Sequence, residues 1–558
     1  MYEVSIMRTN FLLRLAAILL LSAAIGGMAL QMPHHSSAET REKHVRFLHI
    51  ADTHAQLDTH WEYLPEDPNT LHKMGGFARI KTALDEFRNS APGAVFTLDG
   101  GDTFQGSAVA AWTKGEAIVA PLNALRIDVG IPGNWDVVYG PDTFKMLLHE
   151  VNYKVLCYNF QDSRTGKRIF PPSAILEKDG VRVAFIGVTD PTTTKRQPPA
   201  EVQGLDSTHM EGLRSYVQNL KAAEHPDLVV LVDHTGLAPS VQLAHDIPEL
   251  DIVLSAHTHE RVYEPILVGH TIVVEPGSLG SFLGKLDITL KDGKIVDHNY
   301  QLVYIDGDHF PEDPKMRALI QNIENPYRMR MDRVIGMTNT PLMRDDVLES
   351  TMDDLVADSV REAAHSDIGV TNGFRFSPPI APGPITEADL WNMLPLDARM
   401  KVGETTGRQL RSYLEDEMEL VFAQNPFALS GGWGPRPSGM EITFHARAPK
   451  GERIRSIRVN GNDVADAQLY TFGGCERDGE SLDTVCRMRD VRNVHYVPGT
   501  IHEALESFIR KHSPLNYRRQ GRVRADDLPS VVWSQYGILQ DFWNLPGASK
   551  ATEVPGKN

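Results

Sequence analysis

The stretch AVFTLDGGDTFQGS, residues 94–107, joins an apolar run of strand length to a polar turn that contains three glycines. Similar runs occur at residues 45–52, 182–188, 227–234, 251–257 and 271–277. These runs are rich in Val and Ile and end in polar or glycine-containing turns, which is typical of strands buried inside an α/β fold. Their alternation with helical patterns predicts an α/β sandwich in which several strands end in residues that can carry chemistry.

The alternation of strand-length apolar runs and helical patterns ends after this region. Residues 285–305 contain two alternating runs separated by an Asp-Gly pair, which predicts a hairpin that closes the first domain. Proline and acidic residues then precede a helical pattern, so we expect a linker helix at residues 306–335. A second domain is expected at residues 336–545, with helices around Thr351–Ala364 and after Ile385–Glu387.

Length and charge limit the classes of function. A chain of 558 residues with 41% hydrophobic content is expected to form two or three domains. The formal net charge of −17 argues against a nucleic-acid polymer as partner, because such binding requires clustered Lys and Arg. A small or locally recognised substrate fits this charge better.

The N-terminus predicts export. Arg8 and Arg14 lie before and at the edge of the apolar run Leu15–Leu30, and small residues at 27–29 offer a cleavage site. Sixteen residues suit the apolar region of a secretory signal better than a bilayer span. We therefore expect residues 1–30 to be a cleaved signal peptide that directs the protein to the periplasm without a stable membrane anchor; an uncleaved anchor is the alternative.

Three cysteines are present, Cys157, Cys475 and Cys486. In an exported protein the last two are close enough in sequence to close a short disulfide loop, which would leave Cys157 unpaired. Spacing alone does not decide between this disulfide and three separate thiols.

Seven residues with carboxylate, imidazole or amide side chains lie at the ends of the apolar runs. They are Asp52, His54, Asp102, Asn134, His234, His257 and His259. Alternate residues of an extended segment point the same way, so the pairs Asp52/His54 and His257/His259 are each expected to aim two ligands into one pocket. Such a set, with one shared carboxylate, predicts two divalent cations and a hydrolytic reaction.

These residues stand in motifs that resemble a known family. The metal motifs are DTH, GGDTFQGS, GNWD, the isolated His234 and AHTH, and the second half adds TNGFRF, GPITEADLWNMLP and TTGRQLRSYLED. Together they resemble the calcineurin-like metallophosphoesterases, specifically the 5'-nucleotidase family. The resemblance implies a four-layer α/β/β/α metallophosphoesterase sandwich at residues 44–305 and an α+β 5'-nucleotidase-type substrate-binding domain at 336–545.

The same resemblance implies a division of the ligands between the two cations. One cation would take Asp52, His54, Asp102 and His259. The other would take Asp102, Asn134, His234 and His257. Manganese is the expected metal and zinc is possible, because carboxylate, amide and imidazole ligands accept several divalent ions.

The residue after Asn134 departs from the family pattern. In ordinary members that position is a histidine, oriented by an aspartate three residues later, whereas this chain has Trp135 and Val138. An indole N–H donates one hydrogen bond but cannot shuttle a proton near pH 7. We therefore expect Trp135, together with Asp102 and Asn134, to define a catalytic centre poorly suited to ordinary phosphomonoesters.

The motif GNWDVVYG is similar to that of the thiosulfohydrolases of the bacterial sulfur-oxidation system. Those enzymes use two manganese ions to release sulfate from a cysteine S-thiosulfonate on a carrier protein. That branch often replaces the first histidine of the last metal motif, but this chain keeps His257, as nucleotidases do. The sequence therefore combines features of both groups.

The second domain is expected to bind the substrate. Asn372 and Arg375 match the family residues that face the phosphate, and Trp433 occupies the position of one of two aromatic side chains that sandwich a nucleobase. The second aromatic position falls in YTFGGCERDGES, where no aromatic residue follows the glycines. Arg436 is a further expected anion contact, with a solvated loop arginine as its alternative.

Three functions remain open from the sequence. The first is an exported thiosulfohydrolase-like enzyme acting on a sulfur-carrier protein, and the second is a periplasmic 5'-nucleotidase acting on a small nucleotide. The third is a binding protein that keeps the scaffold but has lost catalysis.

Overall fold

The computed structural model describes residues 42–429, 432–545 and 552. The predicted signal peptide at residues 1–30 lies outside the described residues. From His44 onward the chain forms one compact unit. Within the described residues, no helix combines the length and apolar character needed to cross a membrane.

Two six-stranded sheets form the first half of the structure. The order of the first is β16-β15-β1-β4-β5-β6 and that of the second is β13-β14-β12-β11-β9-β8. The first contains β1 Lys43–Ile50, β4 Ala94–Asp99, β5 Val129–Gly130, β6 Lys154–Val155, β15 Phe282–Lys291 and β16 Lys294–Tyr304. The second contains β8 Ser173–Lys178, β9 Val181–Thr189, β11 Leu228–His234, β12 Ile252–Ser255, β13 Ile266–Val268 and β14 Thr271–Val274.

The central strands of both sheets are parallel. In the first sheet β1, β4, β5 and β6 run in one direction, and in the second β9, β11, β12 and β14 do so. All four positions of β12 and all seven of β11 are buried, as expected when a strand is covered on both faces. The carboxyl ends of the parallel strands in each sheet therefore lie along one edge.

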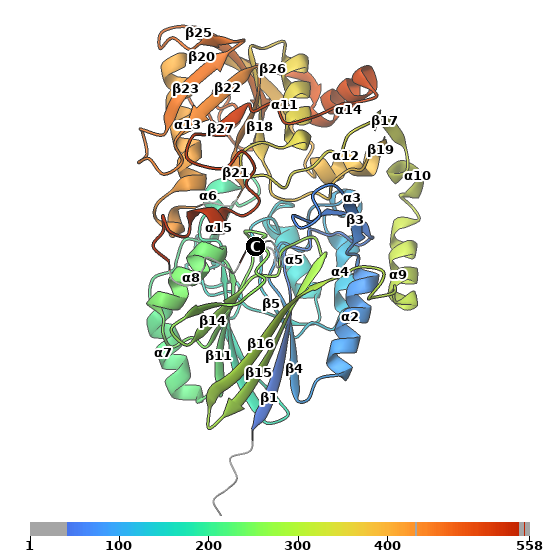
Figure 1. Ribbon diagram of the computed structural model, residues 1–558, viewed down its shortest axis with the longest axis vertical. Coiled ribbons are helices and arrows are strands. Elements are labelled where there is room, and N and C mark those ends of the chain that lie inside the picture. The colour runs from blue at the N-terminus through green and yellow to red at the C-terminus, as the bar shows by residue number, and fades with distance from the viewer. Residues whose placement is uncertain (1–41, 430–431, 546–551, 553–558) are drawn as a thin grey trace, which may run out of the picture. The chain divides into compact units, whose positions relative to one another are not determined.

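The two sheets pack face to face and helices cover their outer faces. Phe47, Phe96 and Phe185 belong to the apolar core between the sheets. The first sheet is covered by α2 Phe77–Asn89, α4 Glu116–Ala124, α5 Pro141–Glu150 and α9 Pro314–Glu324, and the second by α7 Leu213–Glu224 and α8 Leu237–Asp246. Figure 1 shows α7 and α8 on the opposite side of the strands from α2 and α9. The predicted α/β/β/α sandwich is confirmed.

Short elements connect these layers. They are β2 His60–Tyr63, β3 Leu71–Met74, α3 Ala108–Thr113, β7 Gln161–Asp162, α6 Thr193–Arg196 and β10 Leu205–Asp206. The predicted hairpin is formed by β15 and β16, which pair antiparallel through Asp292 and Gly293. Both turn residues have positive φ, 54° and 71°, as a two-residue hairpin turn requires.

The second half is a mixed α and β structure, as predicted. Its five-stranded sheet has the order β21-β18-β25-β20-β26, and its four-stranded sheet the order β24-β23-β22-β27. The strands are β18 Ile368–Gly373, β20 Arg399–Thr406, β21 Trp433–Ser438, β22 Met440–Phe444, β23 Ile454–Val459, β24 Asn462–Asp463, β25 Leu469–Cys475, β26 Arg492–Thr500 and β27 Val523–Ala525. A separate pair joins β17 Val334–Thr338 to β19 Gly383–Thr386.

The helices of this half, except for α10, begin at residues whose side chains cap them. They are α10 Arg328–Met331, α11 Thr351–Ala364, α12 Glu387–Met393, α13 Gly407–Phe422, α14 Ile501–His512 and α15 Gln535–Leu539. Ser350 caps α11, and Thr386 forms a reciprocal capping box with Asp389 at the start of α12. The two predicted helices of this domain are therefore present with the expected starts.

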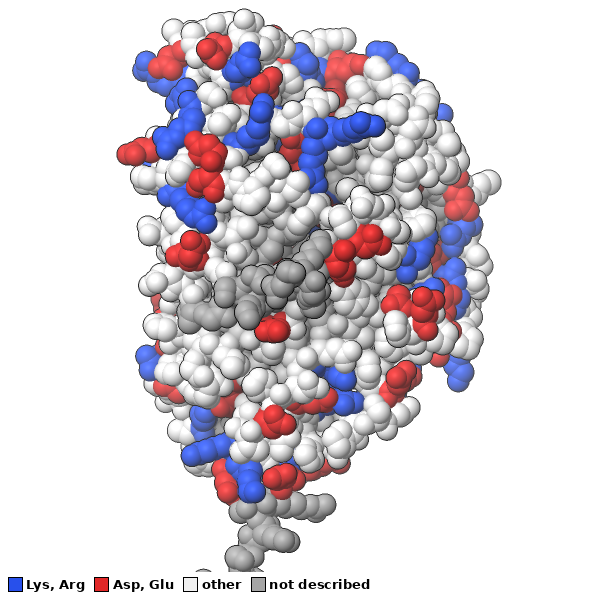
Figure 2. All heavy atoms as spheres, viewed as in Figure 1, with Lys and Arg blue, Asp and Glu red and all other residues white. Residues whose placement is uncertain are grey.

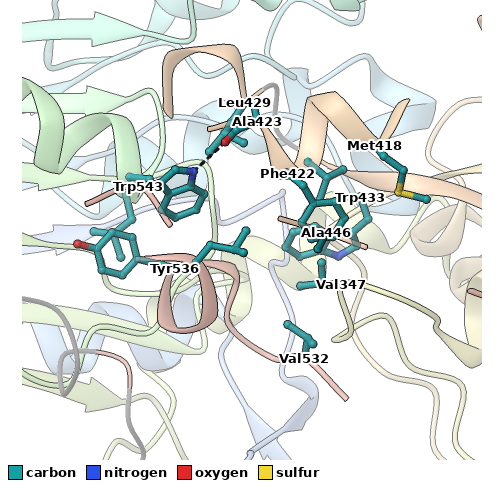
Figure 3. Close-up of a cluster of buried hydrophobic side chains, with 14 of the residues drawn as sticks. Val347, Met418, Phe422, Ala423, Leu429, Trp433, Ala446, Val532, Tyr536 and Trp543 are labelled. Atoms are coloured by element: carbon teal, nitrogen blue, oxygen red, sulfur yellow. Dashed lines mark hydrogen bonds between the residues drawn. The ribbon is translucent and has the colours of Figure 1, made fainter. Parts of the chain in front are cut away.

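The last described segment returns to the first half of the structure. Glu260, which follows the last metal motif, accepts hydrogen bonds from Ser534 Oγ at 2.6 Å and from the Tyr536 amide at 2.8 Å. Figure 3 shows Tyr536 and Trp543 within an apolar cluster, with Trp543 Nε1 donating to the Ala423 carbonyl. Residues 532–545 therefore link the two halves, and we call them the C-terminal clasp.

Candidate metal centre and substrate cavity

The predicted metal ligands lie where the parallel strands of both sheets end. Asp52, Asp102 and Asn134 follow β1, β4 and β5, whereas His234 ends β11 and His257 follows β12. Because the two sheets face each other, their carboxyl edges meet, which is where open α/β sheets place their sites. One site thus receives side chains from both sheets.

The six carboxylate and imidazole residues form two groups. The first is Asp52, His54 and His259, and the second is Asp102, His234 and His257. Within each group the ligand atoms lie within 4.8 Å of one another. Asn134 joins the second group, since its Oδ1 lies 3.2 Å from His234 Nε2. This grouping is the one that the family resemblance implies.

The two groups are adjacent and share Asp102 and Asp52. Asp102 Oδ2 lies 3.3 Å from His234 Nε2 and 3.8 Å from His54 Nε2, so its carboxylate faces both groups. Asp52 Oδ1 lies 3.4 Å from His259 Nε2 and 3.9 Å from His234 Nε2. A pair of cations about 3.5–4 Å apart, as in two-metal hydrolases, would fit between these carboxylates.

The extended backbone predicted for the ligand pairs is wrong. The pairs do not alternate along extended segments, because Asp52, His54, His257 and His259 have φ of 49°, 45°, 78° and 60°, and Asp102 has φ of 54°. These left-handed conformations are uncommon for residues other than glycine and concentrate at functional sites. Tight turns beyond the strand ends, rather than the strands themselves, aim the ligands.

One buried carboxylate that the sequence analysis did not single out holds these turns together. Asp136 accepts hydrogen bonds from the amides of Asp102, Thr103 and Phe104 and from that of Gly133, at 2.7–3.1 Å. Burial raises its pKa to about 6 despite these donors, and the nearby Asp102 adds to the effect. Asp136 therefore positions both the Asp102 turn and the Asn134 loop, and a carboxylate inside GNWD was the available signal.

Protonation in this pocket suits cation binding. Burial lowers the pKa of His54 to about 4 and holds that of His257 well below its usual range, so both rings are neutral near pH 7. Burial also opposes charge on His234, but the carboxylates of Asp102 and Asp52 outweigh it and raise its pKa to about 10. A cation between those carboxylates would take over the charge that His234 otherwise supplies.

The donor set fits two divalent cations. Asp52 Oδ1 and His259 Nδ1 are buried and have no hydrogen-bond partner among the described residues. Buried polar atoms without partners are costly, and a coordinated ion would satisfy the carboxylate oxygen. Carboxylate, imidazole and amide ligands suit manganese, zinc or iron alike, so the side chains leave the choice of metal open.

Trp135 packs beside this pocket as part of an aromatic wall. Its ring makes edge-to-face contacts with Phe374 and Phe376, at centroid distances of 5.4 and 5.1 Å. Phe376 in turn stacks on the His54 imidazole at 4.5 Å. Val138, where the family has an aspartate, is 2% exposed. The side chains at 135 and 138 are therefore apolar where the family pattern is polar.

A cavity of about 480 Å³ opens beside the metal ligands. Asp102, Asn134, His257 and His259 line it from the first half, and Asn372, Arg375 and Trp433 line it from the second. The structure thus brings these predicted substrate contacts to the predicted metal centre. Arg375 Nη1 lies 3.4 Å from the His257 carbonyl, which places its guanidinium next to the second group of ligands.

The cavity does not contain a two-walled aromatic slot. Trp433 is 8% exposed, and the Arg375 guanidinium lies over its ring at 4.3 Å. At the second aromatic position Arg477 lines the cavity, donating to the carbonyls of Arg196 and Gln197. One wall is therefore covered and the other is replaced by a guanidinium.

The prediction that Arg436 binds an anion is wrong. Its side chain is 1% exposed and does not line the cavity. Its terminal nitrogens donate to the carbonyls of Asp346, Val347 and Leu348, and its Nε lies 3.4 Å from Asp353. The solvated alternative fails as well, because this arginine is a buried structural residue that joins β21 to the start of α11.

Several cavity residues were not found from the sequence. Arg196, Arg487 and Cys475 line the same space. The three cysteines are free, so the disulfide considered above is absent, and the Cys486 amide donates to the Cys475 carbonyl at 3.1 Å. Arg196 ends α6, Cys475 ends β25 and Arg487 lies in a turn, so only the tertiary structure brings them together.

Comparison with known proteins identifies both halves. Residues 45–261 match the family described as calcineurin-like phosphoesterase, and residues 333–473 match the 5'-nucleotidase C-terminal domain. The chain is a calcineurin-like phosphoesterase joined to a 5'-nucleotidase C-terminal domain. Proteins with these domains are metal-dependent hydrolases, so the predicted enzyme class is confirmed. The matched domains end before Cys475, which leaves the strand end at 475 and the C-terminal clasp outside both matches.

The chain is similar to 5'-nucleotidases and to a sulfate thiohydrolase, among other proteins. The 5'-nucleotidase of Vibrio parahaemolyticus is 24% identical over 573 residues, covering 93% of this phosphoesterase and 98% of that protein. Among solved structures, the sulfate thiohydrolase SoxB of Thermus thermophilus has a TM-score of 0.80 at 23% identity, covering 88% of this chain and 98% of that one. A 5'-nucleotidase precursor, also from Thermus thermophilus, has a TM-score of 0.77 at 21% identity, with 87% and 100% covered. These likenesses establish the fold and leave the substrate open.

Proposed function

We propose that this phosphoesterase releases sulfate from a cysteine S-thiosulfonate carried on a protein or peptide. The observation that carries the proposal is the aromatic wall of Trp135, Phe374 and Phe376 at the centre where the family pattern has a histidine and its aspartate. The wall offers no group that can protonate an alkoxide leaving group near pH 7. A substrate whose leaving group needs no proton therefore fits best.

A thiosulfonate meets that requirement. In its hydrolysis a water oxygen bonds to the sulfonate sulfur and the S–S bond breaks. The persulfide leaves with the electron pair as a stable anion, and the two protons of the water go to solvent. Two divalent cations, when held by the seven ligands, supply a water of lowered pKa and a clamp for the oxyanion. The aromatic wall excludes bulk water from the leaving sulfur.

The residues of the second domain orient the oxyanion in this proposal. Arg375 is half-buried, its three hydrogen bonds are all 3.4 Å long, and its Nε is buried with no partner among the described residues. A planar guanidinium that is so weakly bonded is ready to donate to a tetrahedral oxyanion. Asn372 lines the same space and can donate through its amide.

A 5'-nucleotidase is the second candidate. The complete ligand set, including His257, and the relatives named 5'-nucleotidase favour it. Against it stands the cavity, where Arg375 covers Trp433 and Arg477 replaces the other wall. Base stacking contributes about 1–3 kcal/mol per base in nucleic-acid sites, so the missing slot weakens nucleotide binding.

The proposal extends to partners and location. Acidic and basic side chains are interspersed on the face drawn in Figure 2, which suits a locally recognised substrate better than a nucleic-acid polymer. A carrier protein is the proposed macromolecular partner, and the periplasm, reached through the predicted signal peptide, is the proposed location. Manganese is the proposed metal.

The test compares two substrates on one manganese-loaded preparation. We expect sulfate release from a small organic S-thiosulfonate to exceed phosphate release from adenosine 5'-monophosphate, and chelation to abolish the sulfate release. Sulfate release no faster than that of the chelated enzyme would overturn the proposal. Rapid phosphate release from the nucleotide would replace it with the second candidate.

A further inference from the structure

A strained turn presents one side chain to the cavity and places a second against a residue that lines it. Val485 and Met488 pair through reciprocal backbone hydrogen bonds of 2.9 Å, leaving Cys486 and Arg487 as the two turn residues. Both have positive φ, 46° and 71°. Asn-Gly or Asp-Gly is the favoured sequence for such turns, as at Asp292–Gly293 of this chain. A Cys-Arg pair in this conformation is strained, and strained residues concentrate at functional sites, where their side chains act.

Both side chains of this turn are engaged at the cavity. Arg487 lines it and pairs with Glu417, a residue of α13 that is 5% exposed. The Nε of Arg487 is buried and has no hydrogen-bond partner among the described residues. Cys486 Sγ lies 3.7 Å from Asn372 Oδ1, so the turn also contacts the predicted oxyanion-binding segment.

Arg196 extends this positive region toward the metal ligands. Its Nη2 lies 3.9 Å from the Cβ that a side chain at Gly432 would have, and the Gly432 carbonyl accepts from Arg375. Arg375 in turn contacts the His257 carbonyl. The three guanidinium groups line the same cavity, with Arg375 beside the metal ligands, and we call them the arginine row.

Guanidinium groups of the row repel one another. Asp190 and Glu417 act on Arg196 as opposite charges, whereas Arg375 and Arg487 act on it as like charges. Burial, reinforced by Arg487, lowers the pKa of Arg196 to about 9. Guanidinium groups of like charge thus line one desolvated cavity, and an anion bound between them would reduce their mutual repulsion.

We propose that Arg196 and Arg487 bind a second anionic group of the substrate, on the part that leaves, while Arg375 serves the reacting oxyanion. The proposal rests on the proposed function, since it assigns the two ends of one thiosulfonate substrate. A carboxylate is the simplest such group, because a guanidinium binds it in plane with two hydrogen bonds. Away from the metal ligands, Glu201, Asp397, Glu476 and Asp478 line the cavity and would repel the same group. The two other lining arginines are already paired with carboxylates, Arg399 with Glu476 and Arg477 with Glu480. The arginine row is therefore the favoured place for the group.

The experiment compares substrates that differ only in that group. The S-thiosulfonates of 3-mercaptopropionic acid and of 3-mercaptopropionamide have the same shape. A second pair, from 6-mercaptohexanoic acid and its amide, has a longer chain. Dissociation constants are measured by calorimetry on the manganese-loaded protein, and sulfate release is measured separately. We expect the acid of at least one chain length to bind the wild type about tenfold more tightly than its amide.

Two variants and one control locate the effect. Glu417→Gln combined with Arg487→Gln removes the guanidinium without leaving Glu417 unpaired, and we expect it to bind acid and amide equally. Arg487→Gly combined with Glu417→Gln does the same while giving the turn its preferred residue type, so it remains folded if the first variant does not. Arg489→Gln removes a guanidinium two residues away at an exposed position and should keep the preference.

The outcomes separate this proposal from the function on which it rests. Equal binding of acid and amide by the wild type, no binding of either, or a preference that survives both Arg487 variants would overturn the subsite. A preference for the acid that the Arg487 variants abolish supports it, even if no sulfate is released. In that case the thiosulfohydrolase proposal fails and the anion subsite stands.

Discussion

Trp135 is the residue on which the choice of reaction depends. Its ring packs on two phenylalanines, and Val138 is buried beneath the same loop. Both positions are apolar, so the departure from the family pattern is a matched change of two residues. Loss of a single charge-stabilising contact costs about 100-fold to 1000-fold in related hydrolytic sites.

Restoring both polar residues should restore phosphatase chemistry. We expect Trp135→His with Val138→Asp to raise phosphate release from adenosine 5'-monophosphate about 100-fold, because the new carboxylate can orient the new imidazole. Sulfate release from a thiosulfonate should fall as the aromatic wall is lost. Both rates are measured on manganese-loaded protein, with Trp135→Phe as the control that keeps an apolar ring. A double variant no faster than this control would argue against the role given to Trp135.

At the scale of elements, the strands were easier to predict than the turns that follow them. Continuous apolar runs identify buried strands, and the ligands follow those runs directly, so the sequence was enough to expect one metal centre. It was not enough for the geometry, since Asp52, His54 and Asp102 lie in left-handed turns that no local pattern reveals. The buried role of Arg436 was hidden for a related reason, because its carbonyl partners at 346–348 are distant in sequence.

The start of α11 should make stability depend on pH. Asp354, in the first helical turn, is 1% exposed, and burial raises its pKa to about 8 despite the nearby Arg522. The usual value is about 3.9, so between these values the folded chain holds a proton that the unfolded chain has lost. This contribution is fully present below about pH 4 and is lost as pH rises through 8, at up to about 1.4 kcal/mol per pH unit.

Asp354→Asn removes the carboxyl group that binds this proton in the folded chain. We expect the difference in unfolding free energy between wild type and variant to shift steadily against the wild type from pH 5 to pH 8. The measurement is urea unfolding at each pH, in which all other titrating groups are common to both proteins. If the unfolding free energies of wild type and variant change in parallel with pH, the carboxyl of Asp354 is ionised in the folded chain.

At the scale of the whole molecule, cations would connect the two sheets. Asp52 and Asp102 come from the first sheet, and His234 and His257 come from the second. Elemental analysis should find two ions per chain in the wild type and fewer in Asp102→Ala, which loses the shared carboxylate. His445→Ala is the control. The cluster of His445, Asp526 and Asp527 is partly exposed, Asp527 already accepts from the Ala446 and Arg447 amides, and we expect it to hold no ion.

Metal removal should also lower stability. A ligand present at 100 times its dissociation constant stabilises the folded state by about 2.7 kcal/mol, so chelation should lower the melting temperature of the wild type. Chelation should leave the melting temperature of Asp102→Ala nearly unchanged. Equal melting temperatures with and without chelator in the wild type would contradict a link between the sheets.

The C-terminal clasp should contribute more than its length suggests. Trp543 is 6% exposed within the cluster of Figure 3, and removing a buried tryptophan costs about 3–5 kcal/mol. We expect Trp543→Ala to lower the free energy of unfolding by that amount. Trp543→Phe should lose only the hydrogen bond to Ala423, about 1 kcal/mol. If the two variants unfold at the same denaturant concentration, the packing role is wrong.

The clasp also sets an order of events during biosynthesis. Glu260 belongs to the first half of the chain, yet its two donors, Ser534 and the Tyr536 amide, are made last. The first domain emerges from the ribosome with this buried carboxylate still unsatisfied, and it stays incomplete until synthesis of the second domain has ended. Final assembly is thereby delayed until nearly the whole polypeptide is present, and under the proposed export this delay would leave the chain loosely folded while it crosses the membrane.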